Sequence, residues 1–357
     1  MAPSATRTKL LLLLQLALAG CGTALLFQSP HYPQEAVGET PPKGKIFFLM
    51  LADRYIEWED IWVSFFSSAS GGGRGVTFEA FLHCQNHAAC LENVQRQDLF
   101  TIIPTVESRY CGNLVSPMVA LLSAAVGSAE TASPGDAFAF VSGNSLPVKP
   151  LWLAQRMLTR DLAGMAIFET SADARCGAFK ASQWSVLRHS HAEKLLQGAA
   201  AVARTTGFNN RIAIRPRGCG GCLDENWPIV RIFGVEALKK YPAEVPATLR
   251  VQSLMYANWS KGIPKMRLLS RHKGHEVGEE LQAGENDTGL WGREEGPLGP
   301  ELFTSVGADL LTRLRGDPSA LFMRKVNRST SFEGPGSLSL PKAWDEYILK
   351  DGMPQGA

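Results

Sequence analysis

Two adjacent carboxylates, Asp224 and Glu225, lie between a glycine-rich turn, Cys219-Gly-Gly-Cys222, and an apolar run that suits a helix. A helix that begins there would hold one carboxylate at the edge of a site and direct the other elsewhere, because consecutive helical positions do not share a face. A fixed carboxylate is the group that a general base needs to take a proton from a hydroxyl. The alternative interpretation is an acidic first turn that stabilises the helix dipole.

Histidine and cysteine side chains gather between His83 and Cys90, with Cys84 and His87 among them. Together with the two cysteines of the glycine-rich turn they would offer zinc ligands, but the spacing matches no common zinc module. The Cys-x-x-Cys pair is also a candidate redox motif, although it does not follow an early strand as in thioredoxin. In an oxidising lumen, disulfides are favoured. Of the 7 cysteines, all except Cys21 then suit up to three bridges, whose pairing stays open.

Aromatic and basic residues supply further candidates. Trp184 and Trp259 lie in polar neighbourhoods, where an indole face can grip a sugar ring or simply complete a core. Arg324 and Lys325 come at the end of an apolar run, and alternation along a strand would send them to opposite faces. Only one of them is therefore expected to face a given site, and a solvated strand end is the alternative.

Several common chemistries lack their motifs. The sequence contains no Gly-x-Ser-x-Gly elbow, no Rossmann glycine fingerprint and no Walker loop. It also lacks an Asp-x-Asp triplet, a carboxylate pair that holds a divalent metal on a nucleotide sugar. The net charge of +2 and the scattered basic residues argue against a nucleic-acid partner.

Alternating strands and helices must position these residues, and this alternation predicts an α/β fold with a mostly parallel sheet. The expected strands are Lys45–Leu51, Val76–Leu82, Leu99–Val106, 137–141, Leu249–Leu254 and Leu321–Val326. The expected helices are Glu57–Phe66, Leu114–Val126, Leu151–Thr159, Ser190–Ala203, Trp227–Lys240 and Glu301–Leu314. Ligands gather at the carboxyl ends of such strands. Those ends are Ala52–Arg54, His83–His87, Glu107–Arg109 and Ser142–Ser145.

The N-terminus predicts a membrane anchor. Arg7 and Lys9 precede an uncharged, mostly apolar run at 10–27, which suits an uncleaved signal anchor with the bulk of the chain on the luminal side. A cleaved secretory signal and a lipoprotein site at Cys21 are the alternatives. The expected organisation is a cytoplasmic tail at 1–9, the anchor at 10–27, a proline-rich stem at 28–44, a catalytic domain at 45–335 and a loosely ordered C-terminal tail at 336–357. Sequons at Asn258, Asn286 and Asn327 agree with a secretory route.

Six segments, in this order, resemble the core-2/I-branching β-1,6-N-acetylglucosaminyltransferase family, including its plant and protist branching-enzyme-like relatives. They are Lys45–Met50 with the helix that ends in Phe65-Phe66, Phe140–Lys149, Ser182-Gln-Trp184, Cys222-Leu-Asp-Glu225, Tyr256–Lys261 and Leu321–Lys325. The resemblance covers residues 43 to 330. It implies a GT-A-type, Rossmann-like fold on a type II Golgi anchor, with a luminal catalytic domain and no divalent metal or other cofactor.

The resemblance also assigns roles. It implies inverting transfer of a sugar from a UDP-sugar donor to a glycan or glycoprotein acceptor. N-acetylglucosamine is the sugar that the resemblance indicates. Glu225 would be the catalytic base, Lys325 would bind the donor diphosphate, and Trp259 and Trp184 would line the acceptor site. A second cation is expected after Trp259, and both Lys265 and Arg267 are candidates, because Ile263-Pro264 replaces the family's His-Pro pair. A xylosyl- or glucuronosyltransferase, or a catalytically silent sugar-binding relative, is the alternative.

Overall fold

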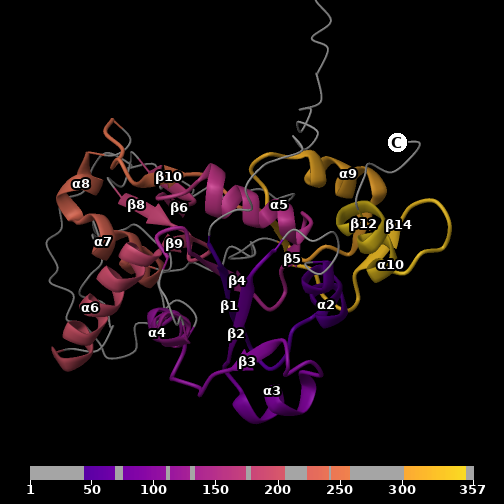
Figure 1. Cartoon of the computed structure of the whole chain (residues 1–357), viewed down its shortest axis with the longest axis horizontal. Helices are drawn as coiled ribbons and strands as arrows, with labels where there is room; N and C mark the ends of the chain where they lie inside the picture. Colours follow the sequence, from indigo (N-terminus) through magenta and orange to yellow (C-terminus); the bar gives the residue numbers. More distant parts are fainter. Residues whose placement is uncertain are drawn as a thin grey trace, which may run out of the picture. The chain divides into compact units, whose positions relative to one another are not determined.

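An uncharged apolar run, Ile46–Ala52, forms the central strand β1, and its first five residues are buried. The computed structural model describes residues 44–68, 75–109, 113–128, 133–173, 178–205, 223–240, 243–257 and 301–350 (Figure 1). Strand β4 (Ala137–Ser142), beside β1, is buried along its whole length. Strands covered on both faces read as continuous apolar runs, and these two fit that rule.

The main sheet has seven strands, and six of them share one direction. In spatial order they are β10 (Leu249–Val251), β6 (Ala166–Phe168), β9 (Val186–Arg188), β4, β1, β2 (Phe78–Cys84) and β3 (Phe100–Ile102). Strand β9 alone is antiparallel to its neighbours, β4 and β6. The expected α/β fold with a mostly parallel sheet is therefore confirmed. The amino end of β9 lies at the edge where the other strands have their carboxyl ends.

Helices cover both faces of this sheet (Figure 1). One core cluster is rich in aromatic residues and packs helices against one face: α2 (Glu59–Ser67), α5 (Leu151–Arg156), α9 (Ala308–Gly316) and α10 (Leu340–Trp344). The other cluster packs four helices against the opposite face: α4 (Val115–Ser128), α6 (His189–Thr205), α7 (Trp227–Phe233) and α8 (Val235–Lys239). A short helix, α3 (His87–Asn93), follows β2.

Short strands build three small sheets beside the main one. The first orders β11 (Met255–Ala257), β13 (Phe322–Arg324) and β5 (Leu146–Pro147), the second pairs β12 (Ser305–Gly307) with β14 (Ser331–Glu333), and the third pairs β7 (Thr170–Asp173) with β8 (Ala178–Ala181). Strand β13 is antiparallel to β5 and pairs Phe322 with Pro147. This pairing brings the C-terminal region back to the loop that follows β4.

Four expectations about these elements need correction. The strand expected at Leu99–Val106 covers only Phe100–Ile102, because Pro104 has no N–H to give to a ladder. The helix expected at Trp227–Lys240 is interrupted at Gly234, whose φ of +86° suits glycine. The segment Glu301–Leu314 begins with strand β12, and its helix starts only at Ala308.

The fourth correction concerns the C-terminus, which was expected to be loosely ordered. Residues Leu340–Trp344 form α10, and a π-helical turn at Asp345–Leu349 continues it. Trp344 is fully buried, and its Nε1 donates a hydrogen bond to the Pro147 carbonyl at 2.7 Å. A buried tryptophan with a satisfied N–H anchors the segment on the aromatic core.

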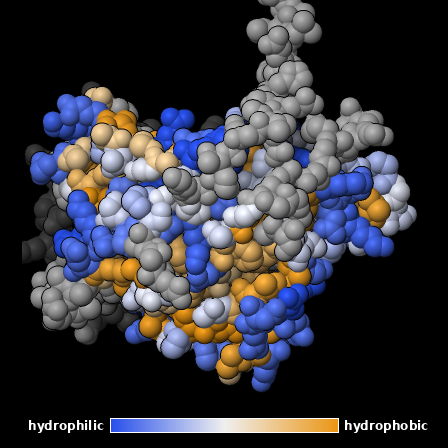
Figure 2. All heavy atoms as spheres, in the orientation of Figure 1, coloured by the Kyte–Doolittle hydropathy of each residue, from blue (hydrophilic) through white to orange (hydrophobic). Residues whose placement is uncertain are grey.

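Four large apolar side chains are exposed on the described surface. The space-filling view shows polar residues mostly toward the periphery of the face in view (Figure 2). The large exposed apolar residues are Tyr55, Leu91, Val245 and Leu302, which lie far apart in the sequence. Within the described ranges no helix has both the length and the apolar character needed to cross a bilayer. The expected anchor at 10–27 and, apart from Gly44, the expected stem at 28–44 lie outside these ranges.

Candidate functional site

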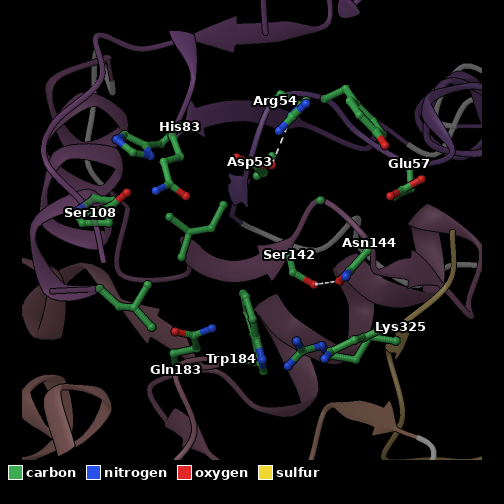
Figure 3. A pocket seen from close by; sticks show the side chains of 18 residues that line it. Asp53, Arg54, Glu57, His83, Ser108, Ser142, Asn144, Gln183, Trp184 and Lys325 are labelled. Atoms are coloured by element: carbon green, nitrogen blue, oxygen red, sulfur yellow. Dashed lines mark hydrogen bonds and ion pairs between the residues drawn. The ribbon is translucent and has the colours of Figure 1, made fainter. Parts of the chain in front are cut away.

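A cavity of about 480 Å³ opens at the carboxyl edge of the parallel strands. Its walls include residues from the ends of β1, β2 and β4, among them Asp53, His83 and Ser142 (Figure 3). Volumes of several hundred Å³ are typical of small-molecule sites. All four strand ends that were expected to gather ligands contribute to this one cavity, the fourth through Ser108 alone.

The first wall of the cavity depends on the close approach of the loops after β1 and β4. The amide of Glu57 donates to the Gly143 carbonyl at 2.9 Å. A Cβ atom on Gly143 would lie 2.8 Å from the Cβ of Ala52, so only glycine lets the two loops meet. On either side of Gly143, the Ser142 hydroxyl donates a hydrogen bond to Asn144 Oδ1 at 2.7 Å. The loops after β1 and β4 thus form the first wall of the cavity.

A second wall comes from the segment before β9. The amide of Phe140 donates to the Ser185 carbonyl at 2.9 Å, so Gln183 and Trp184 lie beside the end of β4. Both line the cavity, although each is more than nine-tenths buried. Since β9 is antiparallel, its amino end carries these side chains to the edge where the parallel strands end.

The third wall holds two cations, Arg324 and Lys325. The amide of Val326 donates to the Asn144 carbonyl at 3.0 Å, which ties this segment to the loop after β4. The Arg324 guanidinium lies over the Trp184 ring, 4.6 Å from its centroid, a cation–π contact. The expectation that only one of the two cations faces the site is wrong. Strand β13 ends at Arg324, so strand alternation does not extend to Lys325.

Electrostatics at this wall favour an anion. Burial lowers the pKa of Lys325, and the neighbouring Arg324 charge lowers it further. Within the described residues the Lys325 ammonium has no hydrogen-bond partner. Two cations side by side repel one another, and a phosphate between them would relieve that repulsion.

Acidic side chains also surround the cavity. Asp53 pairs with Arg54 at 3.2 Å, and both are exposed. Glu57 Oε2 accepts from the Arg328 amide at 3.2 Å. Glu169, just beyond β6, has its pKa raised by burial, while a hydrogen bond from Ser253 and the Arg324 charge act in the opposite direction. The described residues contain no group of three or more histidine, cysteine or acidic side chains placed to hold a metal ion.

The His83–Cys90 cluster is not a zinc site. Cys84 and Cys90 form a disulfide, which removes both thiolates. His83 Nε2 lies 3.1 Å from the Val106 amide nitrogen and 3.3 Å from the Val106 carbonyl oxygen, so either tautomer bonds to Val106, and burial lowers the pKa of His83. This contact orders the loop after β3. Cys111, Cys176, Cys219 and Cys222 lie outside the described residues, so the other bridges stay predictions.

The structure brings together only part of the expected site. Trp184 and Lys325 line the same cavity. Glu225 lies on a 3₁₀ turn, Leu223–Asn226, and is buried, but it is not among the described residues that line the cavity. Its role as a base therefore stays a prediction. Trp259, Lys265 and Arg267 lie outside the described residues.

Sequence reasoning missed three contributors. Gln183 and Asn144 lie within the segments Ser182–Trp184 and Phe140–Lys149, but no local pattern distinguishes an amide that faces a cavity from one that faces solvent. Arg324 was noted, but strand alternation placed it on the face opposite to Lys325. The triplet Ser182-Gln-Trp184 directly before an apolar run was the available signal for Gln183, because residues at a strand end share the edge of the sheet.

No family model and no curated protein matches this chain. Among solved structures, 2-C-methyl-D-erythritol 4-phosphate cytidylyltransferase (IspD) from Francisella tularensis is 10% identical, with a TM-score of 0.28, and the match covers 46% of this chain and 82% of that one. Rv0371c from Mycobacterium tuberculosis is 12% identical, with a TM-score of 0.26, over 47% of this chain and 86% of that one. Likenesses this low carry no functional argument.

Proposed function

We propose that the protein is an inverting, metal-independent glycosyltransferase that moves a sugar from a UDP-sugar to a hydroxyl of a glycan acceptor. The observation that carries the proposal is the cavity at the carboxyl edge of the sheet, where Arg324 and Lys325 stand beside Trp184. A diphosphate needs compensating positive charge as it leaves, and basic side chains supply it without a metal. The fold, in this proposal, is a GT-A-type variant of the observed α/β sheet.

The proposed reaction is an in-line displacement. The acceptor hydroxyl attacks the anomeric carbon from the face opposite the UDP, the bond to the diphosphate oxygen breaks, and UDP leaves with that electron pair. Glu225 takes the hydroxyl proton. Trp184 supplies an apolar face for a substrate ring, and Trp259 together with Lys265 or Arg267 completes the acceptor and donor sites. N-acetylglucosamine is the proposed sugar, by the resemblance of the six segments.

The proposed location is the Golgi membrane, with a type II anchor at 10–27. The charge pattern around that run supports it. The Cys84–Cys90 disulfide agrees with an oxidising lumen. The partners are then a UDP-sugar, a glycan or glycoprotein, and the membrane itself.

A catalytically silent relative is the second candidate. Its support is specific: Glu225, the proposed base, is not among the described residues that line the cavity. Such a protein would bind UDP or sugar through the cationic wall without transfer. Xylosyl or glucuronosyl transfer is a sister activity that a donor panel separates.

The test is transfer by the full-length chain in EDTA, with a panel of UDP-sugars and mixed glycan acceptors. Wild type is compared with Glu225→Gln and with Glu57→Gln, a control carboxylate at the cavity whose backbone contact an amide can keep. We expect transfer by wild type and Glu57→Gln, and a loss of at least 100-fold in Glu225→Gln, since general bases contribute roughly 10²–10⁴-fold.

Other results would change the proposal in defined ways. Loss of activity in EDTA with recovery on manganese would refute the metal-independent mechanism. Equal transfer by Glu225→Gln would remove Glu225 from the chemistry, and loss in Glu57→Gln alone would make Glu57 the base. UDP binding without any transfer would favour the silent relative.

A further inference from the structure

Asn144 presents an unused amide N–H₂ group at the cavity, beside the two cations. Its side chain lines the cavity, where its Oδ1 accepts the hydrogen bond from the Ser142 hydroxyl at 2.7 Å (Figure 3). Within the described residues its Nδ2 has no hydrogen-bond partner, and Nδ2 is not one of the buried polar atoms there that lack one. The acceptor half of this amide is therefore occupied, and the donor half is accessible to a ligand.

Two hydroxyl groups fix the orientation of this amide. The Ser145 hydroxyl lies 2.6 Å from that of Ser142, and Ser145 is fully buried. Because Ser142 gives its single proton to Asn144, the Ser145 proton serves the Ser142 oxygen. The other acceptor within reach of Ser145 among the described residues, Met255 Sδ at 3.7 Å, is a weak one. Hydrogen bonds in such a chain polarise one another, so the amide is held with Nδ2 turned away from Ser142.

The strand pairing places this donor next to Lys325. Strands β13 and β5 are antiparallel, with Met323 opposite Leu146. The same register, continued past the ends of both strands, sets Lys325 opposite Asn144. The hydrogen bond from the Val326 amide to the Asn144 carbonyl, at 3.0 Å, joins the two segments at that point. Both side chains line the cavity, so the neutral donor and the cation serve the same space.

The charges around Asn144 limit what it can bind. Arg324 and Lys325 bring two positive charges to this side of the cavity. Glu57 also lines the cavity, but its Oε2 accepts from the Arg328 amide, and within the described part of the chain it forms no ion pair with Lys325. A phosphate group suits the remaining donors, because its oxygens accept several hydrogen bonds at once. A neutral donor adds one such bond without adding to the repulsion between the two cations.

We infer that Asn144 Nδ2 donates a hydrogen bond to a phosphate oxygen of the bound nucleotide and so completes a diphosphate site with Arg324 and Lys325. The inference rests on the proposed function for the identity of the nucleotide, and it adds the neutral donor of the site. Ser142 and Ser145 orient that donor through the hydrogen-bond chain.

The test is calorimetric titration of the full-length chain in EDTA with UDP and with inorganic pyrophosphate, together with thermal midpoints, in wild type and three variants. Asn144→Asp keeps an oxygen that accepts from Ser142 and replaces only the N–H₂ group, with a charged oxygen. Asn144→Ala removes the donor without adding charge. Asn86→Asp is the matched control, because Asn86 Oδ1 accepts from the Ala89 amide at 3.1 Å and the residue is not among the described residues that line the cavity.

The three variants should differ in a defined order. We expect Asn144→Ala to bind both ligands roughly 10-fold more weakly, the scale of one lost hydrogen bond to a charged group. Asn144→Asp should lose on the order of 100-fold, because its carboxylate also repels the phosphate. Its thermal midpoint should match that of wild type, since the bond from Ser142 is kept. Asn86→Asp should bind both ligands within a factor of about two of wild type, because aspartate also caps a helix well.

Each other outcome decides the inference. Unchanged affinity in Asn144→Ala overturns it even if Asn144→Asp binds more weakly, because that loss would come from charge alone. Weaker binding of UDP with unchanged binding of pyrophosphate also overturns it, because the contact would then be with the nucleoside. Both results leave the proposed function intact. If wild type binds pyrophosphate through Asn144 but does not bind UDP, the phosphate contact stands and the proposed function falls. If wild type binds neither ligand, both fall.

Discussion

Two lysines follow the two strands of one antiparallel pair, and they meet opposite environments. Lys149 comes after β5 and Lys325 after β13, so the pairing of Phe322 with Pro147 places them at opposite ends of the ladder. Lys149 is fully buried, and its ammonium donates to the Leu314 carbonyl and, at 2.7 Å, to that of Arg315. Lys325 instead lines the cavity.

The comparison shows that partners, rather than residue type, decide what a buried cation does. The two carbonyls that Lys149 contacts belong to the last turn of α9, where the helix dipole is negative. Lys149 therefore caps the C-terminal end of α9, and its ammonium group is occupied by these hydrogen bonds. At the other end of the ladder the described residues leave the Lys325 ammonium unsatisfied beside Arg324, and this end can accept an anion from outside.

The largest expected effect is on stability at the closed end. In Lys149→Met the apolar stem is kept, but the buried Leu314 carbonyl and the partly buried Arg315 carbonyl lose their donor. We expect the free energy of unfolding to fall by about 2–3 kcal/mol. Chemical denaturation monitored by tryptophan fluorescence measures it. UDP affinity should stay within a factor of two, and a variant as stable as wild type would contradict the structural role.

The next effect is on binding at the open end. In Lys325→Met one of the two cations at the cavity is lost, and we expect UDP affinity to fall about tenfold, or ~1.4 kcal/mol. Stability should change by less than about 0.5 kcal/mol, because the ammonium has no partner in the described residues to lose. Calorimetric titration with UDP measures the first quantity. Unchanged affinity would mean that the lysine is only solvated at the cavity rim.

The cavity wall formed by the parallel strands was predictable from the sequence. Strands β1, β2 and β4 are apolar runs flanked by polar residues, and the rule that ligands gather at their carboxyl ends correctly grouped Asp53, His83 and Ser142. Such runs are buried on both faces, so local composition is enough to identify them. The approach of Gly143 to Ala52 follows from the same geometry.

The other walls were not predictable, because their placement depends on long-range pairing. Strand β9 has three residues and was not expected at all, yet its antiparallel direction brings Gln183 to the cavity. The segment Arg324–Lys325 reaches the cavity through the Val326–Asn144 hydrogen bond, which joins residues far apart in the chain. The C-terminal helix α10 was missed for a similar reason: its order comes from burial of Trp344 rather than from a periodic pattern.

Raising the pH has opposite effects at the two ends of the ladder: it increases stability at Lys149 and decreases anion affinity at Lys325. Burial lowers the pKa of Lys149 from its ordinary value of 10.5 to about 8. Between these two pKa values the unfolded chain binds more protons than the folded one, so the stability of wild type relative to Lys149→Met rises with pH across that window. At the open end the pKa of Lys325 is also lowered by burial. Affinity for an anion there falls as the pH rises through that lowered pKa.

The expected effect is a loss of UDP affinity as the pH rises through the lowered pKa of Lys325. It should not exceed the roughly tenfold loss in Lys325→Met, because titration removes at most the one charge that this substitution removes. Calorimetric titration with UDP in two buffers of different ionisation enthalpy measures proton uptake on binding. Wild type should take up protons, and Lys325→Met should lack the part of this uptake that Lys325 contributes. If both proteins show the same pH profile, Lys325 does not carry the anion-binding charge. Arg324, which stays charged throughout, would then bind the anion alone, and the contrast between the two lysines would reduce to their burial.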